Sequence, residues 1–177
     1  MEIKAATARL TGYRHQQDGT NCQDWVRYKM QDGISVLSLC DGAGSCAHAE
    51  EAASHISEWV ISYVAERFEE LYEDFSRDRK KALVEEGQRH LAEAGSSLRE
   101  YGCTLLFFAA SEDGRWLCGH IGDGVMFMTD ENGTEVLSKP ENGFYKNETY
   151  FLSGADAEEH LRIQTGKAEI DTAVLLS

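Results

Sequence analysis

Two apolar runs joined by an Asp-Gly turn constrain this chain more than any other feature. Residues 25–30 and 34–40 are rich in aliphatic, aromatic and β-branched side chains, and Asp32-Gly33 lies between them. Asp-Gly in this position is a strong hairpin signal, because it suits the positive φ angles of a two-residue turn. The second run ends in Asp41-Gly-Ala-Gly44, where glycines permit a sharp turn. We therefore expect a β-hairpin that leads into a helix.

The hairpin predicts that two acids meet at one of its ends. Asp24 precedes the first strand and Asp41 follows the second, so antiparallel pairing brings them close together. Carboxylate oxygens and backbone carbonyls are the ligands that Mg²⁺ and Mn²⁺ prefer. The alternative is a strand–turn–helix junction in which Asp41 only bonds to loop amides. The spacing alone leaves both interpretations open.

The rest of the chain predicts two helices between two groups of strands. Apolar residues from Ile56 to Leu71 recur at helical spacing, and a break near 74–78 precedes a second helix over roughly 79–101. A loop is expected over 13–22. The expected strands cover 2–13, 25–30, 34–40, 103–110, 115–121, 125–129, 134–137, 150–152, 161–164 and 173–176. Hairpins, a helix pair and further hairpins indicate one α+β domain over 1–177 with antiparallel sheets.

Composition excludes several classes of protein. The 177 residues have a formal net charge of −14, which argues against binding to nucleic acid or to anionic membranes. The sequence shows no N-terminal signal segment and no long apolar run, so we expect a soluble cytoplasmic protein. Five scattered cysteines without a CxxC pair indicate reduced thiols rather than disulfides or a zinc site.

A third acid lies on a glycine-rich turn, in Gly122-Asp123-Gly124. A shared divalent cation would relieve the repulsion between Asp24, Asp41 and Asp123, and such clusters commonly activate a water molecule. The chain has no GxxxxGK[ST] phosphate loop, GxSxG elbow or HExxH motif. Ser45 and Cys46 have no evident base partner, so a covalent nucleophile is not favoured.

The order of the motifs resembles a known family. Cys22-Gln-Asp24, Cys40-Asp-Gly-Ala-Gly44, Gly102-Cys-Thr104, Gly122-Asp-Gly124 and the ending 166–177 resemble the metal-dependent serine/threonine protein phosphatases of type 2C, above all their compact bacterial branch. The resemblance covers essentially the whole chain. It implies a four-layer α-β-β-α sandwich of two antiparallel sheets, flanked by antiparallel helix pairs.

The same resemblance implies a site with two or more Mg²⁺ or Mn²⁺ ions. Asp24, Asp41, Gly42 and Asp123 correspond to metal-binding positions, with Asp24 and Asp41 as the catalytic residues. The implied reaction is attack of a metal-bridged hydroxide on phosphoserine or phosphothreonine. The implied partners are a phosphorylated protein substrate and a cognate Ser/Thr kinase, with no nucleic acid and no membrane. His15 is our candidate for binding phosphate, and Lys29 and Arg27 are the alternatives.

Several positions depart from the family pattern. Gln23 replaces the first acid of a pair, Ala43 replaces the usual histidine, and Ser177 falls where the family continues with Asp-Gly. His48 could approach the site, although a capping or surface role is favoured. On this basis we expect a C-terminal part to be missing and the chain alone to be a poor enzyme. The alternatives are a catalytically inactive phosphatase-like binding or regulatory module, and an α+β domain without metal.

Overall fold

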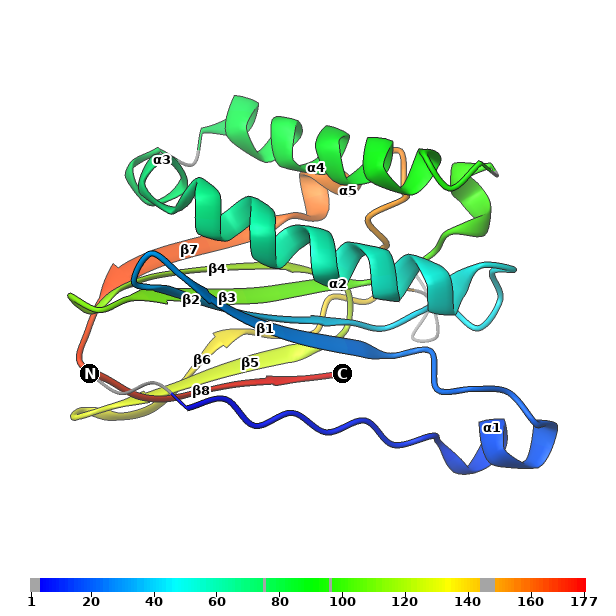
Figure 1. The fold of residues 1–177 in the computed structure, drawn as a ribbon, viewed down its shortest axis with the longest axis horizontal. Coiled ribbons are helices and arrows are strands. Elements are labelled where there is room, and N and C mark those ends of the chain that lie inside the picture. The colour runs from blue at the N-terminus through cyan, green and yellow to red at the C-terminus, as the bar shows by residue number, and fades with distance from the viewer. Residues whose placement is uncertain (1–3, 75, 96, 144–148) are drawn as a thin grey trace.

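Two antiparallel sheets lie face to face, and helices cover the outer face of the larger one (Figure 1). This computed structural model describes residues 4–74, 76–95, 97–143 and 149–177, without the side chains of Arg14, His15 and Asp18. The α+β class with two antiparallel sheets is as predicted. The described residues form three of the four expected layers, because the helices that pack on a sheet lie over the larger sheet.

The elements follow one another in an order close to the predicted one. The helices are α1 (Tyr13–Asp18), α2 (Ala49–Glu66), α3 (Phe68–Glu73), α4 (Arg77–Ala92), the 3₁₀ helix η1 (Leu98–Glu100) and α5 (Ala157–His160). The strands are β1 (Trp25–Gln31), β2 (Ile34–Cys40), β3 (Leu105–Ser111), β4 (Arg115–Ile121), β5 (Val125–Asp130), β6 (Gly133–Ser138), β7 (Arg162–Lys167) and β8 (Ile170–Leu176).

The five-stranded sheet has the order β1-β2-β3-β4-β7. The predicted hairpin is present: Trp25 pairs with Cys40, and Gln31 pairs with Ile34 across the turn. Asp32 and Gly33 have φ angles of 50° and 79°, as a tight two-residue hairpin turn requires. Because every pairing is antiparallel, the start of β1, the end of β2, the start of β3 and the end of β4 all lie at one end of the sheet.

The three-stranded sheet has the order β6-β5-β8. The sequence pattern predicts that the strand-like segments 161–164 and 173–176 are linked through Gly166-Lys167, whereas both of these residues lie in β7, which ends at Lys167. β7 pairs with β4 in the larger sheet, whereas β8 pairs with β5 in the smaller one. The chain therefore changes sheets between these strands, because each completes a different core.

Two hydrophobic cores explain why β3 is apolar along its whole length. Phe107 contributes to the core between the helices and the larger sheet, and Phe108 contributes to the core between the two sheets. Successive side chains of a strand point to opposite faces, so a strand between two cores needs apolar residues at every position. The helical core is completed by α2, whose Ile56, Val60 and Val64 are fully buried.

Three predicted elements differ in the structure. Residues 4–12 of the predicted first strand form no strand, because most of their side chains are exposed and bury no apolar face, and 13–18 form α1 instead of a loop. The second helix ends at Ala92 rather than near 101. Three residues beyond this helix end, Gly95 adopts a φ of 96°. Residues 150–152 form no strand, and the preceding Thr149 makes an isolated bridge to Asn142.

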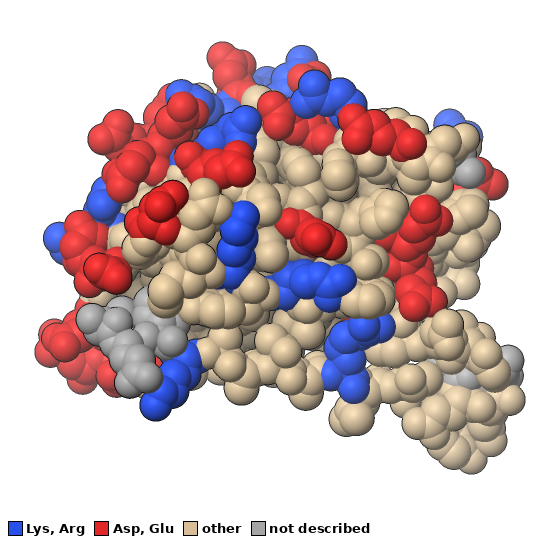
Figure 2. Space-filling view, in the orientation of Figure 1, with Lys and Arg blue, Asp and Glu red and all other residues tan. Residues whose placement is uncertain are grey.

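Charged side chains cover much of the helical layer. Figure 2 shows Asp and Glu gathered over the helices with Lys and Arg interspersed among them, as is usual for a solvated helix face. Within the described ranges, none of the helices has the length and apolarity needed to span a bilayer.

Candidate metal centre

Three acids lie at the end of the larger sheet where the start of β1 and the ends of β2 and β4 come together. Asp24 directly precedes β1, Asp41 directly follows β2, and Asp123 lies two residues beyond β4. Asp24 and Asp41 are partly buried, whereas Asp123 is exposed. The structure therefore places the three predicted acids at one end of the larger sheet.

The Asp24 carboxyl lies near enough to Asp41 to change the pKa of the Asp41 carboxyl. Burial, a hydrogen bond shared with Asp24, and repulsion from Asp24 and Asp123 together raise the pKa of Asp41 from 3.8 to about 7. Burial is the largest of these causes, and each of the others arises from a neighbouring acid. In the absence of a cation, one carboxyl of this pair therefore holds a proton close to neutral pH.

The main chain of Asp41 is held by Thr104, at the start of β3. The Asp41 amide donates to the Thr104 hydroxyl oxygen at 2.9 Å, and the Thr104 amide donates to the Asp41 carbonyl at 2.9 Å. Thr104 is buried. Sequence patterns do not reveal this contact, because only the β2–β3 register places Thr104 opposite Asp41.

Gly42 lies where three segments cross. A Cβ atom at this position would lie 2.5 Å from the Ala49 carbonyl oxygen and 3.0 Å from the Gln23 carbonyl oxygen. The Gly42 amide donates to that Gln23 oxygen at 3.2 Å. Main-chain atoms cannot move aside as a flexible side chain can, so only glycine fits here. The need for glycine thus arises from close packing at the metal-site candidate.

The Gln23 side chain does not join the acid pair through any described hydrogen bond. Its Oε1 atom is buried and has no hydrogen-bond partner among the described residues. Gln23 lines a hollow of about 450 Å³ at the start of α2, together with His48 and Glu51. His48 is partly buried, stacks on Tyr101 and lies 3.1 Å from Glu51 through Nδ1, and its side chain makes no capping hydrogen bond at the start of α2.

The three candidate phosphate-binding residues lie in different surroundings or outside the described side chains. The side chain of His15 lies outside the described residues. Lys29 donates to the Ser62 hydroxyl at 3.1 Å, on α2, and Arg27 stacks over Trp25 at 4.2 Å. Arg9, which was predicted only as part of a first strand, stacks over Trp25 at 3.8 Å and donates to the Cys22 carbonyl at 3.1 Å.

The carboxylate oxygens of these acids are the type of ligand that a divalent cation prefers, although the acids do not form a complete ligand set. Within the described ranges, no three His, Cys, Asp or Glu side chains lie close enough together to hold a metal ion. However, Asp24 and Asp41 share a hydrogen bond, and the charge of Asp123 reaches Asp41. A cation would relieve this repulsion, and water can supply the remaining ligands of Mg²⁺. The donor set therefore fits a hard, partly hydrated ion.

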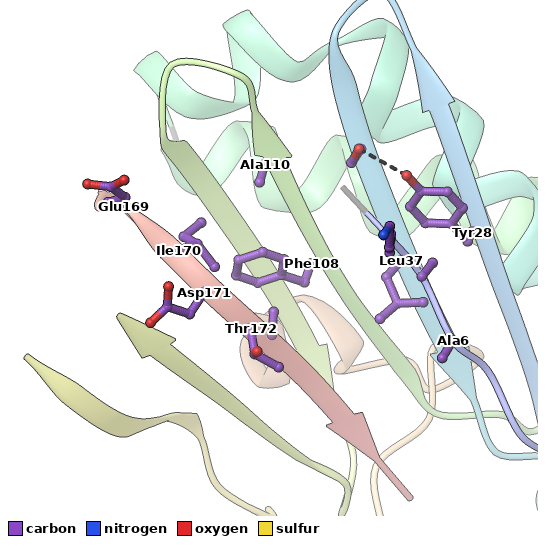
Figure 3. Close-up of a pocket in the computed structure, with 13 residues that line it drawn as sticks. Ala6, Tyr28, Leu37, Phe108, Ala110, Glu169, Ile170, Asp171 and Thr172 are labelled. Carbon is purple, nitrogen blue, oxygen red and sulfur yellow. Dashed lines mark hydrogen bonds between the residues drawn. The ribbon is translucent and has the colours of Figure 1, made fainter. Parts of the chain in front are cut away.

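A larger cavity of about 480 Å³ lies elsewhere, between the two sheets. Figure 3 shows Phe108, Leu37 and Ile170 around it, with Tyr28 bonded to Ser35 on the side of the larger sheet. Its rim contains Glu169 and Asp171. None of the three clustered acids lines this cavity, so we do not place the reaction here.

Comparison with known proteins identifies the class that this fold and site define. A family model described as protein phosphatase 2C matches residues 11–177. The chain belongs to this family. No curated protein gives a significant sequence match.

Solved bacterial structures share the fold. Serine/threonine phosphatase Stp1 from Staphylococcus aureus superposes with a TM-score of 0.64 at 13% identity, over 100% of this chain and 79% of its own. The S. agalactiae serine/threonine phosphatase gives a TM-score of 0.62 at 18% identity, over 88% and 72%. RsbX, solved in complex with magnesium, gives 0.58 at 17% identity, over 85% and 62%. The chain thus spans less than two thirds of the length of RsbX.

Proposed function

We propose that this protein is a Mg²⁺- or Mn²⁺-dependent phosphatase that hydrolyses phosphoserine and phosphothreonine in proteins. The observation that supports this most strongly is the placement of Asp24, Asp41 and Asp123 at one end of the larger sheet, where Asp24 and Asp123 both raise the pKa of Asp41. Family membership supports phosphate-ester hydrolysis, and the magnesium complex of RsbX supports the type of ion. The proposed partners are a phosphorylated protein and the kinase that phosphorylates it.

In this proposal, Asp24, Asp41, Asp123 and the Gly42 carbonyl hold the ions. Bound divalent ions would supply an activated water and neutralise negative charge on the phosphoryl group. Thr104 fixes the Asp41 main chain through two hydrogen bonds, so the carboxylate starts from a defined position. Such fixed placement matters because this chemistry depends on accurate positioning of the reacting groups.

The experiment is a phosphate-release assay on phosphothreonine peptides, with Mn²⁺ and with EDTA. We expect slow but Mn²⁺-dependent release by the unmodified protein, in keeping with a poor enzyme, and loss of it in Asp41→Asn and Asp24→Asn. Asp113→Asn is the matched control, because Asp113 bonds to Ser111 and Arg115 at the β3–β4 turn, at the opposite end of those strands. A folded protein without activity at any Mn²⁺ concentration would refute the proposal.

A further inference from the structure

Arg162, the first residue of β7, reaches the turn that contains Asp123. Its Nη2 donates to the Gly122 carbonyl at 3.3 Å, across 40 residues of sequence. Its Nη1 donates to the Lys139 carbonyl, and its Nε lies 3.2 Å from Glu141 Oε2. One guanidinium thus links three segments of chain beside the candidate metal centre.

Gly122 is held from two sides. On one side, a Cβ atom at Gly122 would lie 2.6 Å from Thr104 Cγ2, so this residue lies directly against the threonine that fixes Asp41. On the other side, the Gly122 carbonyl accepts the Glu141 amide at 2.9 Å as well as Arg162. Gly122 has a φ of 119°, a backbone conformation open to glycine but strained for other residues. The turn therefore connects Arg162 to the backbone support of Asp41.

The guanidinium is itself held by a network of buried and half-buried groups. Glu141 pairs with His160 at 2.9 Å, and His160 stacks on Tyr150 at 3.3 Å. Nη2 of Arg162 also donates to Nδ1 of His120 at 3.0 Å. Burial, and then the charge of Arg162, lowers the pKa of His120 to about 3, so its imidazole is neutral and can accept this bond. These contacts leave the guanidinium little freedom to turn away from Gly122.

We propose that Arg162 is a positioning residue that fixes the Gly122–Gly124 turn, and with it the Asp123 carboxylate, relative to Asp41 and Asp24. Arg162 acts through the backbone of the turn. Among the described residues it forms an ion pair with Glu141 and none with Asp123. Removal of Arg162 should therefore loosen the placement of Asp123 without removing its charge. The effect on catalysis rests on the proposed function, whereas the effect on the turn does not.

The first measurement is amide hydrogen exchange of the metal-free protein, followed by NMR. In Arg162→Gln we expect the Glu141 amide, which donates to Gly122, to exchange about tenfold faster, because one charged hydrogen bond to the same carbonyl is lost. Arg162→Lys should exchange at an intermediate rate, since an ammonium group can still donate to one carbonyl. The matched control is Arg115→Gln. Arg115 pairs with Glu69 and Asp113 and begins β4, at the end of the strand opposite Gly122.

The second measurement is Mn²⁺ affinity by calorimetry, without substrate. Loss of a group that orients a metal ligand commonly weakens metal binding by about 10- to 100-fold. We expect a weakening in this range for Arg162→Gln, partial recovery in Arg162→Lys, and no change in Arg115→Gln. In the phosphatase assay, the half-saturating Mn²⁺ concentration should rise in the same order, while KM for the peptide at saturating Mn²⁺ stays unchanged.

Each outcome decides a separate point. Unchanged exchange at the Glu141 amide would overturn the link between Arg162 and the turn. Faster exchange with unchanged Mn²⁺ affinity would overturn the positioning of Asp123. If Arg162→Gln does not fold, Glu141→Gln tests the same link, because it removes the ion pair with Arg162 and keeps both hydrogen bonds to Gly122. We expect its amide exchange and Mn²⁺ affinity to change in the same direction by a smaller amount. No change in either quantity would count against the proposal. Absence of phosphatase activity in the unmodified protein would refute the proposed function, while exchange and calorimetry would still decide this inference.

Discussion

Replacing Asp41 by asparagine should stabilise the metal-free protein at neutral and alkaline pH. The pKa of Asp41 is raised from 3.8 to about 7 by burial, by its hydrogen bond to Asp24, and by repulsion from Asp24 and Asp123. Between these pH values the folded protein keeps a proton that the unfolded chain releases. The contribution of Asp41 to the free energy of unfolding therefore falls as the pH rises from about 4 to about 7, and remains low above that range.

The magnitude follows from the size of the shift. About three pKa units at 1.36 kcal/mol per unit give about 4 kcal/mol for a fully ionised Asp41. The side chain is only partly buried, and solvent and salt screen part of the repulsion, so we expect about 2 kcal/mol. Asparagine is neutral at every pH, and its amide can donate to Asp24 in place of the protonated acid.

Urea unfolding between pH 4 and pH 8, in the presence of EDTA, measures this effect. Because His120 titrates with the opposite sign in part of this range, the readout is the difference between the variant and the unmodified protein: the stability gained by Asp41→Asn should grow from pH 4 to about pH 7 and then level off. Asp113→Asn is the control of opposite sign. Hydrogen bonds from Ser111 and Arg115 lower the pKa of Asp113 to about 2, so its charge favours the folded state. If Asp41→Asn is less stable than the unmodified protein at pH 8, the proposed repulsion among the three acids is wrong.

Three further results are expected. Gly42→Ala should lower the free energy of unfolding by about 2 kcal/mol or more in urea titrations, because the new Cβ would meet the main chain of Ala49 at 2.5 Å; equal stability would contradict the close crossing. Because burial holds the pKa of His120 near 3, against 6.5 when exposed, the unfolded chain binds a proton that the folded protein excludes, and the contribution of His120 to stability should be lost as the pH drops from about 6.5 to about 3; in urea titrations extended to pH 3, His120→Asn should lose less stability over this window than the unmodified protein. Mn²⁺ at about 100 times its dissociation constant should add about 2.7 kcal/mol of stability, reversed by EDTA and absent in Asp24→Asn; a melting temperature that is insensitive to Mn²⁺ would contradict the metal centre.

Local patterns were sufficient where a residue's neighbours in sequence decide its conformation. Asp32-Gly33 defined the first hairpin, because a two-residue turn with positive φ angles depends on those two residues. Helical spacing identified the apolar face of α2. The same local reasoning failed over residues 4–12, where alternation predicted a strand but the side chains bury no apolar face. It also extended the second helix beyond Ala92, since the backbone conformation of Gly95 was not known.

The acids of the candidate site were predicted from the sequence, but the residues that hold them in place were not. Asp24 and Asp41 could be paired from sequence, because one hairpin places them at the same end. Thr104 and Arg162 could not be linked to them, because their contacts depend on the β2–β3 register and on where β7 joins the sheet. Gly42 was predicted for its carbonyl, whereas the structure adds a steric reason for glycine.

The sequence by itself determined the hairpin, the apolar helix face and the acids at the strand ends, because these depend on residues that are neighbours or separated by one turn. Only the tertiary structure decided that β7 and β8 join different sheets and that Arg162 reaches Gly122 across 40 residues. Such contacts form when distant segments bury their apolar faces together. The free energy of that burial belongs to the assembled cores, and no single stretch of the sequence encodes it.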